Sequence, residues 1–272
     1  MTSTASAEPS GAVVTQKHIL LGVSTLLVLA SALITIAWSA SMSGMGEMLM
    51  PGGWTMSMTW MRMPGQTWSG AATMFIGMWV VMMVAMMLPS LMPVLSRYGE
   101  TASRTGKTRI GLLTALVGVG YFFVWTLLGL AAFPLGVALT TLAMREPALS
   151  RAVPHAIGAA VLIAGALQFT AWKGRQLACC REASGPDITV RAGAWNALRH
   201  GVRFGLQCGP CCANLMVILL VIGVMDILVM AGVTAAITIE RLAPAGEPVA
   251  RAIGVVAVGG GLLLVARAIG LG

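Results

Sequence analysis

The chain has 272 residues, of which 57% are hydrophobic and only 10% are charged, and its mean hydropathy is +0.87. Soluble domains carry roughly a quarter charged residues, so this composition excludes an ordinary water-soluble enzyme and favours a membrane protein. The net charge of +8 would suggest nucleic acid on a soluble protein. Here we expect the basic residues to mark the cytoplasmic side of the membrane, and we expect no nucleic-acid partner.

Six stretches of the sequence contain the roughly 20 predominantly apolar residues that a membrane-spanning helix needs. We therefore expect an all-α, multi-pass helix bundle in the cell membrane, with a cytoplasmic N-terminus and the lipid bilayer as its surroundings. The predicted spans are residues 19–40, 68–91, 110–133, 154–172, 204–226 with an extension to 239, and 249–271. Residues 18–272 then form one transmembrane domain, and the polar residues 1–17 are expected to be a disordered cytoplasmic tail.

Two apolar runs, residues 110–144 and 204–239, are longer than one span but contain no polar linker. Each is interpreted as one tilted helix that continues at the interface, with Pro134 and Gly223 as expected break points. Pro89 and Pro93 are expected to close the second helix near the cytoplasmic surface. The first apolar run could also be read as a signal peptide, but its length favours a retained span.

The distribution of basic residues supports this orientation. With six spans and a cytoplasmic N-terminus, 12 of the 17 Lys and Arg residues fall on the inner side, as the positive-inside rule requires. The remaining five, on the outer side, are Arg62, Arg145, Arg151, Arg241 and Arg251. The same topology places Glu240 at the outer boundary of the fifth helix and the C-terminus on the inner side.

Methionine is concentrated in one region, because 15 of the 20 Met residues lie between Met42 and Met92. Those in the predicted outer loop are Met42, Met45, Met48, Met50, Met56, Met58, Met61 and Met63. Thioether sulfur is a soft, neutral ligand that suits Cu(I) in an oxidising compartment, so the loop is a candidate for copper capture. The alternative is that Met and Trp side chains only seat the loop among the lipid headgroups.

The second span continues this pattern with methionines four residues apart. Successive members of such a series drift only about 40° around a helix, so they form a slowly winding stripe along it. The candidate soft-metal ligands in this stripe are Met78, Met82, Met83, Met86 and Met87, flanked by Met74 and Met92. The alternative is that these side chains simply pack in the core.

All five cysteines fall on the predicted inner side, where a reducing cytosol would keep them as thiols. Cys179 and Cys180 lie in a basic inner loop, and Cys208, Cys211 and Cys212 form the motif Cys-Gly-Pro-Cys-Cys. If this motif is helical, the three thiols share one face that Met216 extends by a turn. Alternatively, Cys208 caps the helix and Pro210 lies in its first turn. Either arrangement predicts a soft-metal site, whereas simple packing of small side chains is the competing interpretation.

Asp226 is the one acid well inside an apolar run. A carboxylate in hydrocarbon is costly, so it is a candidate metal ligand or interior hydrogen-bonding group. The competing interpretation places it at the outer boundary of a tilted helix, where exposure to water makes it inexpensive.

Several motifs spread over the chain carry a family resemblance. They are Met82-Met83-Val84-Ala85-Met86-Met87-Leu88-Pro89, Tyr121 with Trp125, Gln168 to Lys173 with Cys179 to Arg181, Gly205 to Met216, Met225-Asp226 and Glu240-Arg241. Together they resemble a bacterial family of predicted metal-binding, multi-pass integral membrane proteins. The resemblance implies metal binding and a role as a copper chaperone.

The leading hypothesis is therefore a membrane protein that handles Cu(I) or another soft metal ion. The outer methionines would capture the ion, and the inner cysteines would retain it or pass it to a copper donor or acceptor protein. Two alternatives stay open. One is a membrane thiol-disulfide oxidoreductase that uses Cys208 and Cys211, and the other is a structural or assembly subunit without chemistry of its own.

Overall fold

The computed structural model describes residues 11–44, 48–50, 54–56, 58–62, 65–104, 109–182 and 193–270. Its helices are α1 (Gly11–Gly44), α2 (Trp68–Arg104), α3 (Ile110–Arg145), α4 (Pro147–Leu167), α5 (Ala171–Glu182), α6 (Ala194–Ile222), α7 (Ile227–Leu242) and α8 (Gly246–Ala268). In the part described, α1, α2, α3, α4, α6 and α8 are the six helices long and apolar enough to cross a membrane. The prediction of an all-α bundle with six helices long and apolar enough to span a membrane is confirmed.

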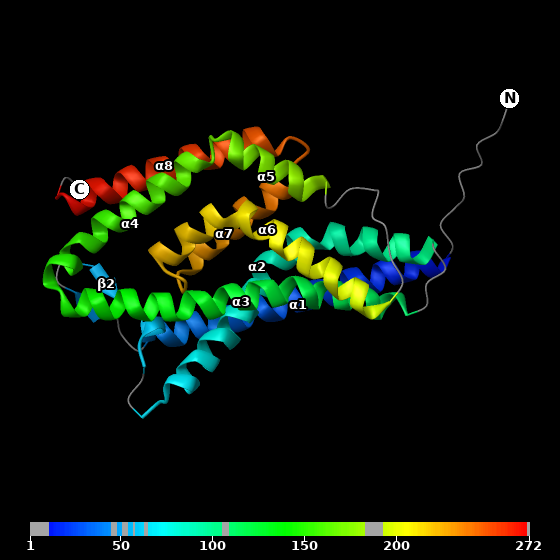
Figure 1. Ribbon diagram of the computed structural model, residues 1–272, viewed down its shortest axis with the longest axis horizontal. Coiled ribbons are helices and arrows are strands. Elements are labelled where there is room, and N and C mark those ends of the chain that lie inside the picture. Colours follow the sequence, from blue (N-terminus) through cyan, green and yellow to red (C-terminus); the bar gives the residue numbers. More distant parts are fainter. Residues whose placement is uncertain are drawn as a thin grey trace.

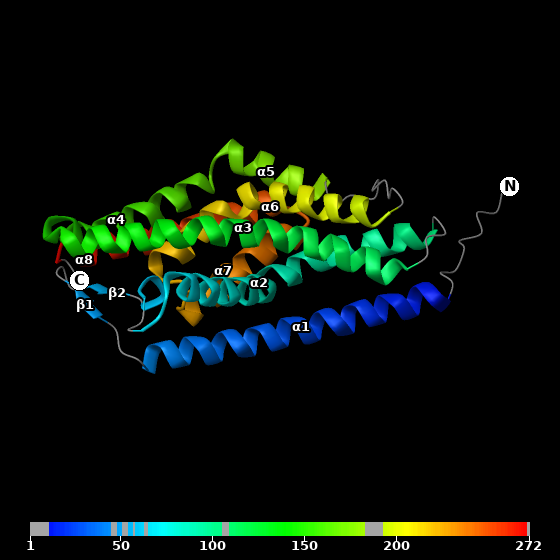
Figure 2. The same ribbon diagram turned by 60° about the horizontal axis from the view of Figure 1, so that its bottom comes forward.

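The helices lie roughly along one common direction, with α6 and α7 between the α2–α3 side and the α4–α8 pair (Figure 1). Helix α1 lies at the edge of the bundle, beside α2 (Figure 2). Its apolar side chains are largely uncovered; Leu26 is 68% exposed and Leu33 is 67% exposed. Such a surface is stable only against lipid, which is consistent with a helix that faces the bilayer.

Glycines bring pairs of helices into close contact. A Cβ atom at Gly120 of α3 would overlap the carbonyl of Leu198 in α6, and one at Gly201 of α6 would overlap the carbonyl of Val117. The antiparallel pair α4 and α8 uses Gly165 in the same way, because a Cβ there would lie 2.9 Å from the backbone nitrogen of Val258. In lipid, helices associate through such close backbone packing, since apolar burial alone gives little driving force.

The long run from residue 204 to 239 is not one continuous helix. Helix α6 ends at Ile222, and Gly223 has φ of 154°, which favours glycine. The predicted break at Gly223 is confirmed, but the expected continuation along the interface is wrong. Helix α7 instead folds back along α6, so that the Arg241 guanidinium lies 3.2 Å from the Cys208 sulfur.

This return helix corrects the predicted topology of the last third of the chain. Glu240 does not lie at the outer boundary of the membrane. It is 1% exposed and forms an ion pair with Lys173, which belongs to the predicted inner side. The start of α1 and the end of α8 lie at opposite ends of the bundle (Figure 1), so the predicted inner C-terminus is also wrong if the N-terminus is inside. With this topology, Arg241 and Arg251 lie on the predicted inner side of the bundle, and Arg267 lies on the opposite side. The excess of Lys and Arg on the inner side is therefore larger than expected from the sequence.

Prolines do not end the helices where the sequence suggested. Helix α2 continues through Pro89 and Pro93 to Arg104, and α3 continues through Pro134 to Arg145. Neighbouring helices can hold a membrane helix together across the missing hydrogen bond, so proline is a weak terminator in this setting. A true boundary occurs at Pro147, which opens α4 in the first helical turn, where its missing N–H costs nothing.

Several other boundaries also shift from their predicted positions. Helix α1 begins at Gly11, inside the expected tail, and α6 begins at Ala194, ten residues before the predicted span. The part of the predicted inner loop that carries Cys179 and Cys180 belongs to the short helix α5. These helical extensions contain polar and basic residues, so long apolar runs in the sequence do not indicate them.

The Met-rich connection between α1 and α2 contains two short antiparallel strands, β1 (Met48–Met50) and β2 (Trp54–Met56), and a 3-10 turn, η1 (Met58–Trp60). The indole of Trp54 donates a hydrogen bond of 2.9 Å to the carbonyl of Ser150 in α4. Trp60 packs on Phe75 of α2, with ring centroids 5.1 Å apart. These aromatic contacts attach the connection to the end of the bundle.

The glycine contact between α3 and α6 yields a test. We expect Gly120→Leu to separate the two helices and to lower stability by about 1–3 kcal/mol or more, as overpacking does. The matched control is Gly118→Leu, two residues away, where a Cβ meets nothing within 4 Å. Thermal unfolding in detergent measures both variants, and equal midpoints would contradict the role of this contact.

Candidate functional site

Four buried cysteines meet inside the helix bundle and are called here the thiol cluster: Cys180, Cys208, Cys211 and Cys212. Their exposed fractions are 3%, 0%, 0% and 2%. The sulfurs of Cys208 and Cys212 are 3.7 Å apart, and Cys180 and Cys211 belong to the same buried cluster. The four thiols therefore lie together where α5 packs on α6.

The local structure explains why these residues meet. Helix α6 is already well under way at Cys208, and Pro210 lies inside it. The helical-face interpretation of the motif is therefore confirmed, and the capping interpretation is wrong. Helix α5 then brings Cys180 alongside α6, where its thiol donates to the Gln207 carbonyl at 3.3 Å. Cys179, the other predicted ligand on α5, is half-buried.

The surroundings of Cys180 influence its protonation. The neighbouring Cys211 thiol, together with burial, raises the pKa of the Cys180 thiol. Cys180 therefore stays protonated at neutral pH in the absence of metal, which agrees with its role as a donor to a backbone carbonyl.

Cys208 faces a polar group of residues from three other helices. Its sulfur lies 3.0 Å from the Tyr121 hydroxyl of α3 and 3.2 Å from the Arg241 guanidinium of α7. Arg241 also donates to the Ser90 hydroxyl of α2 at 2.9 Å, and its guanidinium lies 5.3 Å from the centre of the Phe204 ring. A delocalised cation held in this way can balance negative charge on a nearby sulfur.

A buried ion pair lies on the other side of the cluster. Lys173 is 0% exposed, and its ammonium lies 2.8 Å from a carboxylate oxygen of Glu240. The same ammonium donates to the Cys211 carbonyl at 2.7 Å and to the Asn214 amide oxygen at 3.3 Å. Gln168 donates to the second carboxylate oxygen of Glu240 at 2.7 Å. The network ties α4, α5, α6 and α7 together around the thiols.

The balance of charge around the cluster is positive. Lys173 and Arg241 carry two positive charges, and Glu240 carries the one negative charge that pairs with Lys173. Arg241 has Cys208, Tyr121 and Ser90 as its polar partners in the part of the chain that the structure describes. Because an unbalanced charge in a low-dielectric bundle is costly, the site favours a negatively charged sulfur centre next to Arg241.

The methionine stripe of α2 is buried. Met82, Met83, Met86 and Met87 are at most 2% exposed, and Met78 is 7% exposed, whereas Met74 is 63% exposed. The inner end of the stripe approaches the cluster, because Ser90 bonds both the Met87 carbonyl and Arg241. Met216 is also buried, one turn beyond Cys212 on α6. Burial alone fits either packing or metal binding.

Asp226 lies away from the thiols. It is exposed at the turn between α6 and α7, and one of its carboxylate oxygens accepts hydrogen bonds from the backbone nitrogens of Leu228 and Val229. This is a helix N-cap, which explains a carboxylate in an apolar run without a metal. The structure therefore does not bring this predicted ligand to the cluster.

Other predicted features stay outside what the structure describes. Met45 and Met63 of the outer loop lie outside the described residues, as do the side chains of Met48, Met50, Met56 and Met58. Within the described residues, no group of three or more His, Cys, Asp or Glu side chains has an arrangement that could hold a metal ion. A copper site at the thiol cluster would therefore use fewer such side chains or require them to move.

The sequence did not reveal that three charged residues take part in the site: Lys173, Glu240 and Arg241. They occur in the motifs of the family resemblance, but nothing in the sequence showed that they pair with one another or with a thiol. The available signal was a pair of adjacent charges ending an apolar run, since charges at membrane depth usually have partners.

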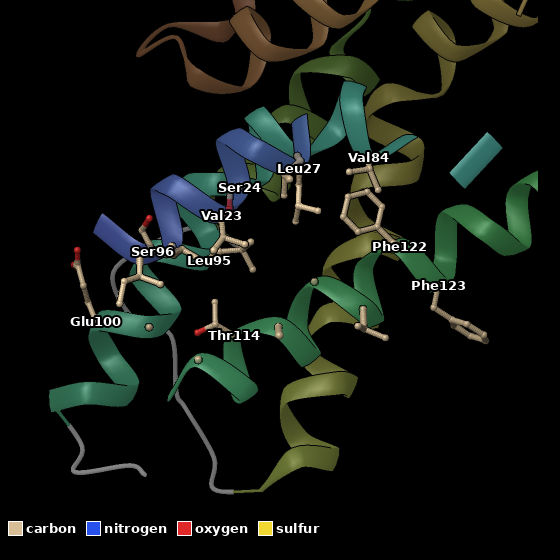
Figure 3. Close-up of a pocket in the computed structure, with 18 of the residues that line it drawn as sticks. Val23, Ser24, Leu27, Val84, Leu95, Ser96, Glu100, Thr114, Phe122 and Phe123 are labelled. Carbon is tan, nitrogen blue, oxygen red and sulfur yellow. The ribbon is translucent and has the colours of Figure 1, made fainter. Parts of the chain in front are cut away.

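A cavity of about 670 Å³ lies apart from the thiol cluster, between α1, α2 and α3. Figure 3 shows Val23 and Leu27 of α1 on one side of it and Thr114 and Phe122 of α3 on the other. The described residues that line this cavity include no Cys, Met or His. It is therefore not a candidate for the soft-metal chemistry that the sequence predicts.

The buried ion pair yields a test of the site's architecture. We expect Lys173→Met to destabilise the protein by about 3–5 kcal/mol, because it leaves the Glu240 carboxylate buried and unpaired. The double variant Lys173→Met/Glu240→Gln removes both charges, so part of the loss should return. Denaturation in detergent micelles measures the stability of Lys173→Met, Glu240→Gln and the double variant. If the double variant lost as much stability as the two single variants added together, the pairing would be contradicted.

Comparison with known proteins identifies a family. No curated protein and no solved structure matches the chain. A family model described as PpoB2, copper chaperone, matches residues 76–264. The matched region includes the buried methionines of α2 from Met78 onward, the whole thiol cluster and the charged residues around it. The chain therefore belongs to the PpoB2 copper chaperone family.

Proposed function

We propose that this protein holds Cu(I) at the thiol cluster inside a membrane helix bundle, before the ion passes to an acceptor protein. The observation that carries the proposal is the position of Arg241, whose guanidinium lies 3.2 Å from the Cys208 sulfur. Membership of a copper chaperone family supports copper as the cargo. The six apolar helices support a location in the cell membrane.

The chemistry of the donors favours a soft monovalent ion. Thiolates prefer Cu(I) to hard cations, and Cu(I) is stable with as few as two sulfur ligands. The sulfurs of Cys208 and Cys212 are 3.7 Å apart, and that of Cys208 contacts Arg241. Two thiolates and one Cu(I) carry a single negative charge, which the guanidinium would neutralise inside the bundle.

The neighbouring sulfurs provide ways for the ion to reach and leave this pair. On one side, the α2 stripe from Met78 to Met87 ends near Ser90, which contacts Arg241. On the other side, Cys211 and Cys180 lie in the same buried cluster, and the half-buried Cys179 follows on α5. Exchange from one sulfur to the next would move the ion without exposing it to water.

Replacement of the cysteines tests the proposal directly. We expect the variant with Cys208, Cys211 and Cys212 changed to Ser to lose bound Cu(I) while it keeps its fold. The measurement is copper content of detergent-purified, reduced protein, with Cu(I) titrated against a chelator and folding checked by thermal unfolding. Cys179→Ser is the control, because it should slow transfer and leave stoichiometry unchanged. Equal copper stoichiometry in wild type and the triple variant would reject the proposal.

Replacement of Arg241 tests the electrostatic part. Hydrogen bonds to charged groups contribute about 1.5–3 kcal/mol, so Arg241→Gln should weaken Cu(I) binding roughly 10- to 100-fold. Arg251→Gln removes a charge from an exposed pair with Glu247 and serves as the control. If both variants bound Cu(I) as tightly as wild type, the guanidinium would have no part in holding the ion.

A further inference from the structure

A second group of sulfur side chains surrounds a small cavity at the other end of the bundle. The cavity has a volume of about 130 Å³ and is lined by Met42, Met61, Met74 and Met78, among other residues. Met42 comes from the end of α1, Met61 follows η1, and Met74 and Met78 lie one turn apart on α2. The end of α1, the segment after η1 and the first part of α2 therefore bring four methionines to one cavity, called here the thioether pocket.

We propose that the thioether pocket is a separate binding site for a monovalent soft cation, Cu(I) or its analogue Ag(I). Thioethers are neutral and soft, so they bind such ions and discriminate against hard divalent cations. The described residues that line the pocket include no Asp, Glu, His or Cys, so they offer no ligand that would favour Ca²⁺, Mg²⁺ or Zn²⁺.

The other lining residues suit the same occupant. Trp38 and Phe75 contribute aromatic rings, which attract cations through their faces and pack favourably against sulfur. The amide nitrogen of Gln66 lies 3.8 Å from the Met74 sulfur, a contact that orients this exposed side chain. The volume would admit a few water molecules, each of about 30 Å³, so an arriving ion could exchange its water for thioethers inside the pocket.

Aromatic packing explains how Met61 is held over α2. The Trp60 ring contacts Phe75, with centroids 5.1 Å apart, and Phe75 contacts Phe133 of α3 at the same distance. Trp60 also occupies the space above Gly136 of α3, where any Cβ atom would overlap its ring. The segment that carries Met61 is thus fixed by contacts that the metal does not have to supply, so the site is preorganised.

The pocket is continuous with the buried stripe of α2. Met78 belongs to both, and Met82 and Met86 follow it at steps of one helical turn. Ser90, which contacts Arg241 beside the thiol cluster, lies roughly 18 Å further along α2 at 1.5 Å per residue. The biological role of the thioether pocket rests on the proposed copper handling, in which it is the place where the ion is first held. Its ability to bind the ion does not depend on the cysteines.

The test compares two triple variants with the same number of thioethers removed. One is Met42→Leu/Met61→Leu/Met74→Leu in the pocket, and the control is Met92→Leu/Met144→Leu/Met225→Leu at positions that do not line it. Both are made in wild type and in the background with Cys208, Cys211 and Cys212 changed to Ser. Ag(I) bound to detergent-purified protein is measured by equilibrium dialysis and elemental analysis, with thermal unfolding as a check on folding.

In both backgrounds, we expect the pocket variant to bind one fewer Ag(I) per chain than its control. Met78→Leu alone should weaken the same binding event, which gives a second reading if the triple variant fails to fold. Equal binding by the pocket and control variants, with Met78→Leu unchanged, would overturn the proposal. Loss of an ion in the pocket variant with no loss in the cysteine variant would keep this site and reject the proposed role of the thiol cluster.

Discussion

The buried ion pair between Lys173 and Glu240 is the interaction on which the centre of this structure depends. Two charges at this depth are stable only if they meet each other and their remaining polar atoms are bonded. Glu240 can reach Lys173 only because α7 reverses at Gly223 and returns along α6. The same return brings Arg241, the next residue, to Cys208. One constraint thus fixes both the path of the chain and the surroundings of the thiols.

The rest of the bundle supports this centre by close backbone packing. Gly120 and Gly201 let α3 approach α6 on the Tyr121 side, and Tyr121 then contacts Cys208. On the opposite side, α4 and α8 pack through Gly165, three residues before Gln168, which bonds Glu240. Helix α1 takes little part in this packing, since most of its apolar side chains face outward. The glycines therefore act on the site indirectly, by setting how near the polar side chains come.

The two kinds of sulfur occupy different environments. The described residues that line the thioether pocket are all neutral, whereas the thiol cluster has an ammonium and a guanidinium within hydrogen-bonding distance of its residues. A neutral site leaves the charge of a bound Cu(I) uncompensated and so holds it loosely. A thiolate site next to a cation compensates that charge and holds the ion firmly. Under the proposed function, this difference would direct the ion from methionines to cysteines.

The sequence by itself determined the fold class, the six apolar helices and the segregation of methionine from cysteine, because helix length, apolar composition and ligand softness are local properties of a segment. The sequence also offered Gly223 as a break point, but it left a helical face and a helix cap open for the cysteine motif, which the structure resolves as a helical face. Only the tertiary structure decided which way α7 runs and that Glu240 and Arg241 serve the site. It alone also brought Met42 and Met61 to Met74. Each of these depends on which distant groups must satisfy one another in a medium without water, and no local pattern in the chain records that pairing.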